Sequence, residues 1–241
     1  MQTTVENSEI EKFASIADQW WDEKGKFRPL HLLNPFRIAY IREKSIAHFG
    51  LKDDLQVFKD LKILDIGCGG GLLSEPMTRL GGKVTGIDAA EKNIKIASAH
   101  AAKAGLAIDY RNVTVEELAK TGEKFDIILN MEVIEHVADV PLFLKSCSAL
   151  LKPGGLMFIA TINRTAKAFA FAVVGAEYIL RLLPIGTHDW KKFLKPSEIN
   201  AVLAPLDVKL KHMAGVSFNP LNEKFKITDD VSVNYMMCYA A

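Results

Sequence analysis

The sequence is poor in cysteine and has no excess of charge of either sign. Its three cysteines, Cys68, Cys147 and Cys238, are widely spaced and include no Cys-x-x-Cys pair, which argues against a disulfide framework or a zinc site and fits a reducing compartment. Thirty basic residues against 29 acidic ones leave a formal net charge of +1, so nothing indicates a nucleic-acid surface. We therefore expect no nucleic-acid partner and a small or lipid substrate.

A targeting signal is also missing. Residues 1–10 contain neither a basic segment nor an apolar one, and they are acidic rather than arginine-rich. The sequence therefore indicates neither secretion nor an intact transit peptide, and we expect a cytoplasmic protein. The chain has 241 residues, 49% of them hydrophobic, and no internal repeat or low-complexity linker, which suffices for one substantial core.

No hydrophobic run is long enough to cross a membrane. The apolar stretch over residues 168–183 has 16 residues, short of the ~20 that a spanning helix needs. It is either a buried core helix or a helix that covers the substrate site and dips into a membrane surface, with Lys191, Lys192 and Lys195 meeting anionic head groups. The second alternative places the protein peripherally on the inner face of the membrane, through about residues 168–195.

The sequence does contain a glycine-rich loop directly after a short apolar segment, residues 62–66. The loop reads Gly67-x-Gly69-x-Gly71, and Asp88 follows 21 residues after Gly67. Glycines let the backbone turn tightly and approach a ligand closely. A carboxylate at the end of the next strand can accept hydrogen bonds from both hydroxyls of a ribose, so this spacing predicts an adenosine-like ligand.

The third glycine of a dinucleotide-binding fingerprint is absent, because Leu72 occupies its position. Asp65 precedes the loop, where a carboxylate would repel a pyrophosphate but suits the ammonium of a methionine moiety. The loop and Asp65 together resemble motif I of the class I S-adenosylmethionine-dependent methyltransferases. A nicotinamide-dependent dehydrogenase, the alternative, is disfavoured by Leu72.

Later segments match that superfamily in order and spacing. They are a strand-like run over residues 124–130, the segment Met-Glu-Val-Ile-Glu-His-Val over residues 131–137, and a Lys-Pro-Gly-Gly turn over residues 152–155. Apolar strands alternate with helical segments from residue 62 to residue 162, which predicts a parallel sheet covered on both faces, with the strand ends converging on one ligand crevice.

We therefore expect an α/β fold with a Rossmann-like seven-stranded class I methyltransferase sheet and helices on both faces. A single domain over residues 1–241 would include an N-terminal helical cap over about residues 1–50 and an inserted apolar segment over about residues 164–195. Strand-like runs near residues 208–210 and 231–239 would complete the sheet as a hairpin pair.

Seven segments narrow the resemblance to one family. They read Trp-Trp-Asp at 20–22, Pro-Leu-His at 29–31, Asn-Pro-Phe-Arg at 34–37, Leu-Asp-Ile-Gly-Cys-Gly-Gly-Gly at 64–71, Met-Glu-Val-Ile-Glu-His-Val at 131–137, Val-Gly-Ala-Glu-Tyr-Ile-Leu at 174–180 and Gly-Thr-His-Asp at 186–189. Together they look like the ubiquinone-biosynthesis O-methyltransferases. The resemblance implies S-adenosylmethionine as methyl donor and, as acceptor, a catechol hydroxyl on polyprenylated intermediates at two steps of ubiquinone synthesis. It leaves open whether the protein works inside a quinone-synthesis complex.

The resemblance also implies a set of donor-binding residues. By position these are Arg37, Gly67, Asp88 and Met131, joined by the loop residues Asp65 and Gly69. Arg37 would pair with the donor carboxylate as a bidentate fork. Met131 would press an apolar surface against the adenine, although a core-filling role is the alternative.

A phenol with a pKa of about 10 needs a base or a cation beside it to attack at neutral pH. Glu132, Glu135 and His136 lie at positions i, i+3 and i+4, which on a helix places them along one face. Two carboxylates and an imidazole can hold a divalent ion, and the resemblance implies Mg²⁺ there. Because magnesium prefers oxygen ligands, the alternative is a metal-free site with His136 as general base. His188, beside Asp189, is the second candidate base.

Two other functions stay open at this point. The protein could methylate a different small-molecule or quinone acceptor on the same fold. It could instead be a non-catalytic member of the family that binds the donor or a lipid as a scaffold. The presence of Arg37, Asp65, Gly67 and Asp88 argues against the scaffold.

Overall fold

The computed structural model describes residues 3–170, 189–219 and 222–241. Most of the apolar stretch at 168–183, and the candidate base His188, lie outside the described residues. Within the described part, no helix is both long and apolar enough to cross a membrane.

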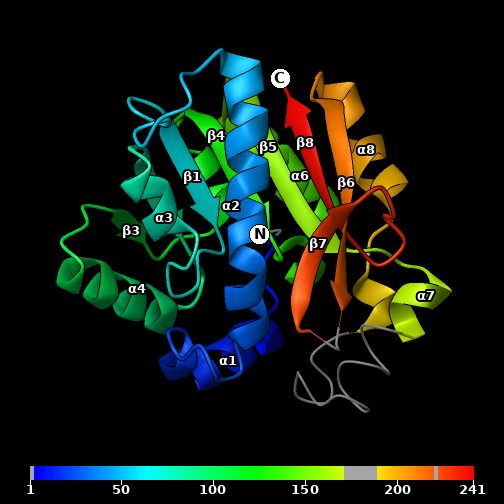
Figure 1. Cartoon of the computed structure of the whole chain (residues 1–241), viewed down its shortest axis with the longest axis horizontal. Coiled ribbons are helices and arrows are strands. Elements are labelled where there is room, and N and C mark those ends of the chain that lie inside the picture. The colour runs from blue at the N-terminus through cyan, green and yellow to red at the C-terminus, as the bar shows by residue number, and fades with distance from the viewer. Residues whose placement is uncertain (1–2, 171–188, 220–221) are drawn as a thin grey trace.

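A mixed eight-stranded sheet with helices on both faces forms the core (Figure 1), in the strand order β3-β2-β1-β4-β5-β8-β6-β7. The strands are β1 (Lys62–Ile66), β2 (Lys83–Ile87), β3 (Asp109–Arg111), β4 (Phe125–Met131), β5 (Leu151–Ile162), β6 (Lys209–Asn219), β7 (Lys224–Thr228) and β8 (Asn234–Ala240). Strands β1 to β5 pair in parallel. Strand β8 is antiparallel to β5 and β6, and β7 is antiparallel to β6. The strand order changes direction at β1, where the carboxyl ends of such a sheet form a ligand crevice.

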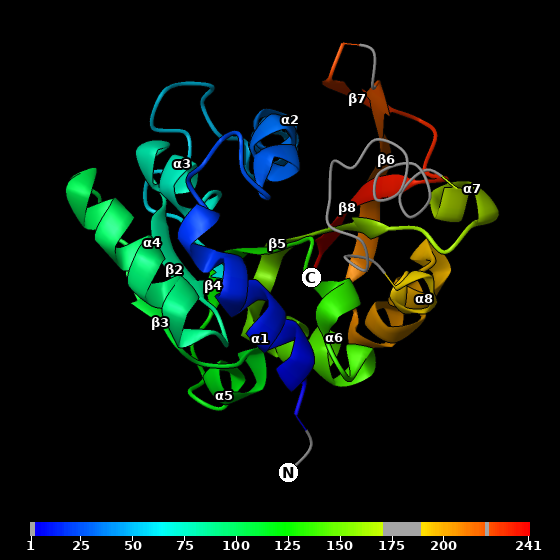
Figure 2. The ribbon, with the colours of Figure 1, turned by 90° about the horizontal axis from the view of Figure 1, so that it is seen from below.

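The helices are α1 (Asn7–Ile16), α2 (Arg28–Phe49), α3 (Ser74–Arg79), α4 (Glu91–Lys103), α5 (Val115–Ala119), α6 (Val140–Leu150), α7 (Ala166–Ala168) and α8 (Pro196–Leu203). Figure 2 shows α2 on one side of the sheet and α5 and α6 on the other. Single 3₁₀ turns lie at η1 (Ala17–Gln19), η2 (Ile134–His136), η4 (Trp190–Lys192) and η5 (Ala204–Leu206).

The predicted fold class is confirmed, with one strand more than the seven expected. The additional strand is β7, which separates β6 from β8 along the chain, so those two strands pair as neighbours but are not a hairpin. Phe225 and Ile227 of β7 pack toward the core, and the Phe225 ring lies 4.9 Å from that of Phe218 in β6 and 6.4 Å from that of Phe36 in α2. Lysines alternate with apolar residues over β7, a pattern typical of a strand, but this short segment was not predicted as one from the sequence.

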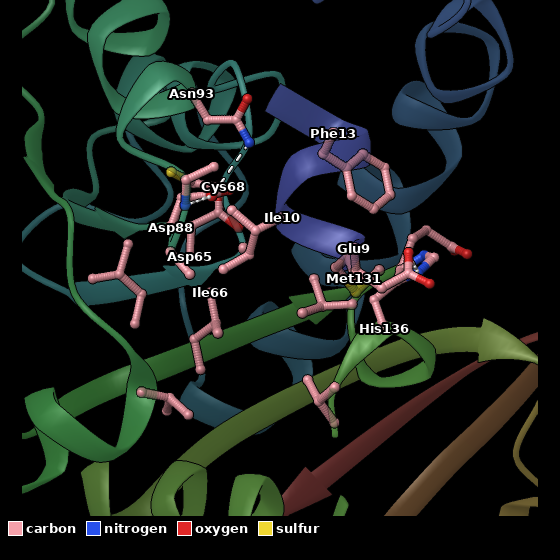
Figure 3. Close-up of a pocket in the computed structure, with 18 of the residues that line it drawn as sticks. Glu9, Ile10, Phe13, Asp65, Ile66, Cys68, Asp88, Asn93, Met131 and His136 are labelled. Atoms are coloured by element: carbon pink, nitrogen blue, oxygen red, sulfur yellow. Dashed lines mark hydrogen bonds and ion pairs between the residues drawn. The ribbon is translucent and has the colours of Figure 1, made fainter. Parts of the chain in front are cut away.

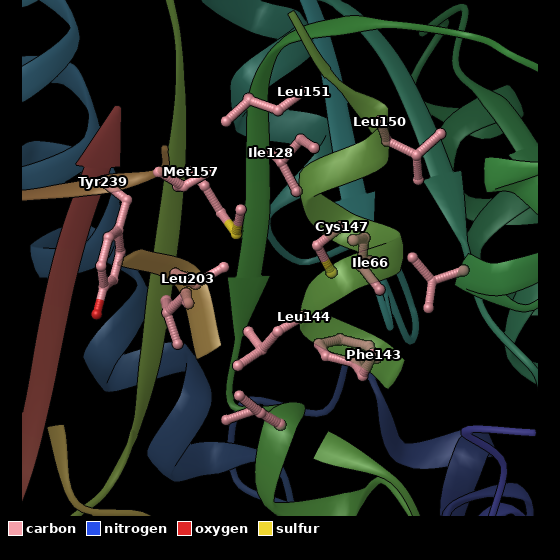
Figure 4. Packing of buried hydrophobic residues seen from close by; sticks show 14 of the residues in the cluster. Ile66, Ile128, Phe143, Leu144, Cys147, Leu150, Leu151, Met157, Leu203 and Tyr239 are labelled. Carbon is pink, nitrogen blue, oxygen red and sulfur yellow. The ribbon is translucent and has the colours of Figure 1, made fainter. Parts of the chain in front are cut away.

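The central strands are apolar on both sides because each face of the sheet is covered. Ile128 of β4 packs with Phe143 and Cys147 of α6 on one face (Figure 4). Its neighbours Ile127 and Leu129 pack on the opposite face, against α2 and α3. This double burial explains why β4 reads as a continuous apolar run rather than an alternating one. The three cysteines are buried and free.

Helix α2 contains two prolines in its first half. It runs from Arg28 to Phe49, with Pro29 in its first turn and Pro35 inside it. Proline removes one backbone donor from a helix interior. The side chain of Asn34 donates to the carbonyl of Leu72 at 2.7 Å, which ties this part of α2 to the end of the glycine loop.

Candidate active site

A cavity of ≈ 190 Å³ lies at the carboxyl ends of β1, β2 and β4, beneath α1 (Figure 3). Most of the residues expected to bind the donor or to act in catalysis line it: Arg37, Asp65, Gly67, Asp88, Met131, Glu132 and His136. Gly69 and Glu135 are not among the lining residues. The topology therefore brings together side chains that are up to about a hundred positions apart in the sequence.

The glycines of the loop meet different steric demands. Gly67 has φ +63°, and a Cβ there would lie 2.7 Å from Cγ2 of Val133. Gly69 has φ +54°, and a Cβ there would lie 2.3 Å from the Trp20 ring. Gly69 is thus required by the packing of Trp20, and its backbone N–H donates to Asp88 at 3.0 Å.

Asp88 is held by three donors at the end of β2. Besides the Gly69 N–H, the Ala90 N–H donates to it at 2.8 Å and the Asn93 amide at 3.2 Å. Burial raises the pKa of Asp88 above its ordinary value, while these three hydrogen bonds lower it. The carboxylate therefore ties the glycine loop to the start of α4. Its Oδ2 accepts one hydrogen bond, from the Gly69 N–H, and so keeps an acceptor position that a ribose hydroxyl can use.

Arg37 and Asp65 bring opposite charges to the buried wall of the cavity. Nη2 of Arg37 donates to Asn34 at 2.9 Å, while its Nε has no partner within the part of the chain that the structure describes. Burial lowers the pKa of Arg37, although the nearby carboxyls of Glu132 and Asp65 oppose this. Asp65 accepts a hydrogen bond from Ser74 at 2.6 Å, and burial raises its pKa to about 6. One wall of the cavity thus offers a carboxyl group for the ammonium of an amino acid and a guanidinium for its carboxylate.

The turn after β4 differs from the expected helix. Glu132 has φ +63° and lies before the single 3₁₀ turn η2, which contains Glu135 and His136. The prediction that all three side chains share one helix face is therefore wrong, because the left-handed residue reverses the chain before the turn begins. Glu132 lines the cavity. Burial, and then the charge of Glu135, raise its pKa to about 7 against the effect of Arg37 and His136.

Glu135 and His136 point to different surroundings. Glu135 is buried, its Oε2 lacks a partner within the described residues, and burial raises its pKa. His136 Nδ1 lies 3.1 Å from the Glu9 carboxylate. No group of three or more His, Cys, Asp and Glu side chains among the residues described could hold a metal ion. This arrangement does not fit the expected Glu132, Glu135 and His136 site for Mg²⁺.

The N-terminal segment closes the cavity. Glu9, Ile10 and Phe13 of α1 line it together with Trp20. The Trp20 indole N–H donates to Asn93 at 2.9 Å, and its ring is both packed in an aromatic cluster and part of the cavity wall. The apolar side chains Ile10 and Phe13 of α1 therefore face the cavity.

Known proteins of one family are similar to this chain over nearly its whole length. The ubiquinone biosynthesis O-methyltransferase of Parvibaculum lavamentivorans is 58% identical over 236 residues, covering 98% of this chain and 93% of the relative. The protein of the same name from Pelagibacter ubique is 54% identical and covers 97% of each chain. The chain belongs to the ubiquinone biosynthesis O-methyltransferase family. A profile of the methyltransferase domain also matches residues 64–159.

Solved structures show the fold of the family at low sequence identity. Magnesium protoporphyrin IX methyltransferase from Synechocystis, with bound SAH, is 15% identical at a TM-score of 0.65 and covers 96% of this chain and 99% of that one. The plantazolicin methyltransferase BpumL, in complex with SAH, is 19% identical at a TM-score of 0.59, covering 97% and 96%.

Membership of the family confirms three expectations. The chain has the class I methyltransferase fold, it is an O-methyltransferase, and S-adenosylmethionine is its methyl donor. The dehydrogenase and the non-catalytic scaffold are therefore set aside. The roles of individual residues stay predictions.

Proposed function

We propose that this enzyme transfers the methyl group of S-adenosylmethionine to a catechol hydroxyl of polyprenylated aromatic intermediates, at both O-methylation steps of ubiquinone biosynthesis. The observation that carries the proposal is the similarity to ubiquinone biosynthesis O-methyltransferases over nearly the whole chain. The cavity that joins Asp88, Asp65 and Arg37 to His136 gives this activity a site.

The donor would lie along the cavity with its adenosine at the end of β2. Asp88 accepts hydrogen bonds from the ribose hydroxyls, and the long bond from Asn93 is the one that a hydroxyl would replace. Met131 lies against the adenine as an apolar surface. Asp65 faces the ammonium of the methionine moiety and Arg37 its carboxylate, because each charge then finds its opposite.

Methyl transfer is an in-line displacement at a carbon that the sulfonium already activates. Holding the catechol oxygen and the methyl group in line can supply up to ~7–11 kcal/mol of the barrier reduction. The hydroxyl proton passes to Nε2 of His136, the oxygen forms a bond to the methyl carbon, and the carbon–sulfur bond breaks to leave a neutral thioether. His188, outside the described residues, is the alternative base.

An assay with a chelator separates the two ways of activating the catechol. Purified enzyme is incubated with S-adenosylmethionine and a prenylated catechol, with chelator or with Mg²⁺, and the O-methylated product is followed by mass spectrometry. Chelator-insensitive product supports a His136 base. Product that vanishes with chelator and returns with Mg²⁺ assigns the activation to a metal. Absence of product under every condition, with the donor bound, contradicts the proposed acceptor and favours another one.

We also propose that the segment around residues 168–195 contacts an anionic membrane surface, where the substrate's isoprenoid tail resides. Phe169 and Trp190 flank the part of this segment that the structure does not describe. They are 46% and 38% exposed, and their ring centroids lie 6.3 Å apart. Two neighbouring exposed aromatic side chains and the basic residue Lys191 are of the residue types that bind at the surface of an anionic membrane.

Liposome flotation tests this contact. Replacing Phe169 and Trp190 together by serine is expected to weaken binding to anionic vesicles, and Leu55→Ser is the matched control because Leu55 is 83% exposed on the loop before β1. Equal binding by both variants and the wild type would contradict the membrane contact.

A further inference from the structure

Glu9 is the point at which the N-terminal helix joins two distant parts of the chain. Its Oε2 lies 3.1 Å from Nδ1 of His136, and its Oε1 lies 3.0 Å from Nζ of Lys192. His136 ends the turn after β4, and Lys192 follows the segment at 171–188. The Glu9 side chain is only 16% exposed, so its contact with the imidazole is largely shielded from water.

Polar contacts add to a partly buried apolar side in holding this part of the chain in place. No residue of α1 is fully buried, and Phe13 and Ile16 pack only partly against the cluster around Trp20. The segment before it is fixed by Thr4, whose N–H and hydroxyl donate to Glu116 at 2.9 and 2.7 Å and whose carbonyl accepts from the Ala138 N–H at 2.9 Å. Figure 3 shows Glu9, Ile10 and Phe13 coming from the same helix toward His136 and the cavity. The position of Glu9 is thus fixed by the Thr4–Glu116 contact before α1 and by its own contact with Lys192.

The contact defines which nitrogen of His136 faces the acceptor. When Nδ1–H donates to a carboxylate, the lone pair of a neutral imidazole resides on Nε2. Nε2 makes no hydrogen bond within the described part of the chain, and His136 lines the cavity. The Phe13 and His136 rings pack edge to face, with centroids 5.0 Å apart and planes at 83°, which restricts the orientation of the imidazole further.

We propose that Glu9 is a positioning residue for methyl transfer: it holds the His136 ring so that Nε2 faces the catechol hydroxyl. This inference rests on the proposed role of His136 as proton acceptor. It also gives different roles to Glu132, Glu135 and His136, which do not form a metal site. Glu132 faces the donor cavity, Glu135 is buried, and His136 is oriented from outside by the N-terminal helix.

A double-mutant cycle tests the inference. Wild type, Glu9→Gln, His136→Ala and the double variant are compared for kcat and KM with a prenylated catechol, and for S-adenosylhomocysteine affinity by calorimetry. Because a positioned base contributes ~10²–10⁴-fold, Glu9→Gln is expected to lower kcat by ~10-fold or more with little change in KM or in donor affinity. In the His136→Ala background the same substitution should have no further effect.

Glu116→Gln is the matched control. Glu116 accepts hydrogen bonds from Thr4 at 2.9 and 2.7 Å but not from His136, and it is not among the residues that line the cavity, so this variant perturbs the anchor of the same segment and should keep kcat. An equal loss in Glu116→Gln and Glu9→Gln, or an additive loss in the double variant, would overturn the positioning role and assign Glu9 to holding α1. An inactive wild type would instead contradict the proposed acceptor, which keeps the two failures distinct.

Imidazole ¹⁵N spectra give a readout that does not depend on turnover. With His136→Ala used to assign its signal among the six histidines, the wild type should show His136 protonated on Nδ1, and Glu9→Gln should show a mixture of tautomers. An unchanged His136 spectrum in Glu9→Gln would contradict the proposal.

Discussion

Removing the Asp88 carboxylate should affect both the donor and the fold. Its oxygens accept from the Gly69 N–H at 3.0 Å, the Ala90 N–H at 2.8 Å and the Asn93 amide at 3.2 Å. Each buried donor left unpaired costs about 1–3 kcal/mol, while the burial that raises the pKa of Asp88 offsets part of this loss. We therefore expect Asp88→Ala to lower the free energy of unfolding by about 3 kcal/mol, measured by urea denaturation.

The substitution Asp88→Ala should also weaken donor binding directly, in addition to lowering the free energy of unfolding. Loss of two charge-assisted hydrogen bonds to the ribose corresponds to at least ~3 kcal/mol, or a ~100-fold or greater rise in Kd for S-adenosylhomocysteine. Calorimetry below the unfolding transition measures it. Asn112→Ala is the control, because within the described residues the Asn112 side chain donates to the backbone carbonyls of Asp88 and Ala89, at 2.9 and 3.0 Å, and not to the Asp88 carboxylate, so the Kd should stay unchanged. Unaltered donor affinity in Asp88→Ala would refute the ribose assignment.

Three further predictions concern the loop and the charged wall. Gly69→Ala should lower the free energy of unfolding by about 1–3 kcal/mol more than Gly105→Ala in urea, because both residues have positive φ but only the first would meet Trp20. Equal losses would argue against the clash. Asp65 has its pKa raised from 3.8 to about 6, so the folded state holds its proton more tightly, and the free energy of unfolding should fall by about 3 kcal/mol as pH rises from about 3 to about 7. Asp65→Asn should flatten that part of the pH profile in urea titrations. Arg37→Met should weaken S-adenosylhomocysteine binding ~10-fold or more but leave 5′-methylthioadenosine, which lacks the amino-acid moiety, unaffected in calorimetry.

The strands around the glycine loop could be predicted from the sequence because burial on both faces leaves continuous apolar runs. The expected strands match β1 (Lys62–Ile66) and β4 (Phe125–Met131) closely. The turn after β4 was predicted wrongly. The spacing of Glu132, Glu135 and His136 is compatible with a helix, but one left-handed residue at Glu132 separates the side chains, and spacing carries no signal for such a reversal.

Contacts between distant segments were not visible in the sequence. Glu9 and His136 are 127 positions apart, and an acidic residue near the start of an amphipathic helix ordinarily indicates only a solvated face. Gly69 was expected to approach the donor, whereas in the structure a side chain at this position would clash with the Trp20 ring. In both cases the deciding partner belongs to the N-terminal region, whose position over the strand ends is set by tertiary packing.

A crystal structure of the enzyme with S-adenosylhomocysteine tests the central claim most directly. The account predicts density for the ligand in the cavity beneath α1, with the ribose on Asp88, the ammonium near Asp65 and the carboxylate near Arg37. Ligand density outside this cavity, or an amino-acid moiety directed away from both Asp65 and Arg37, would contradict it.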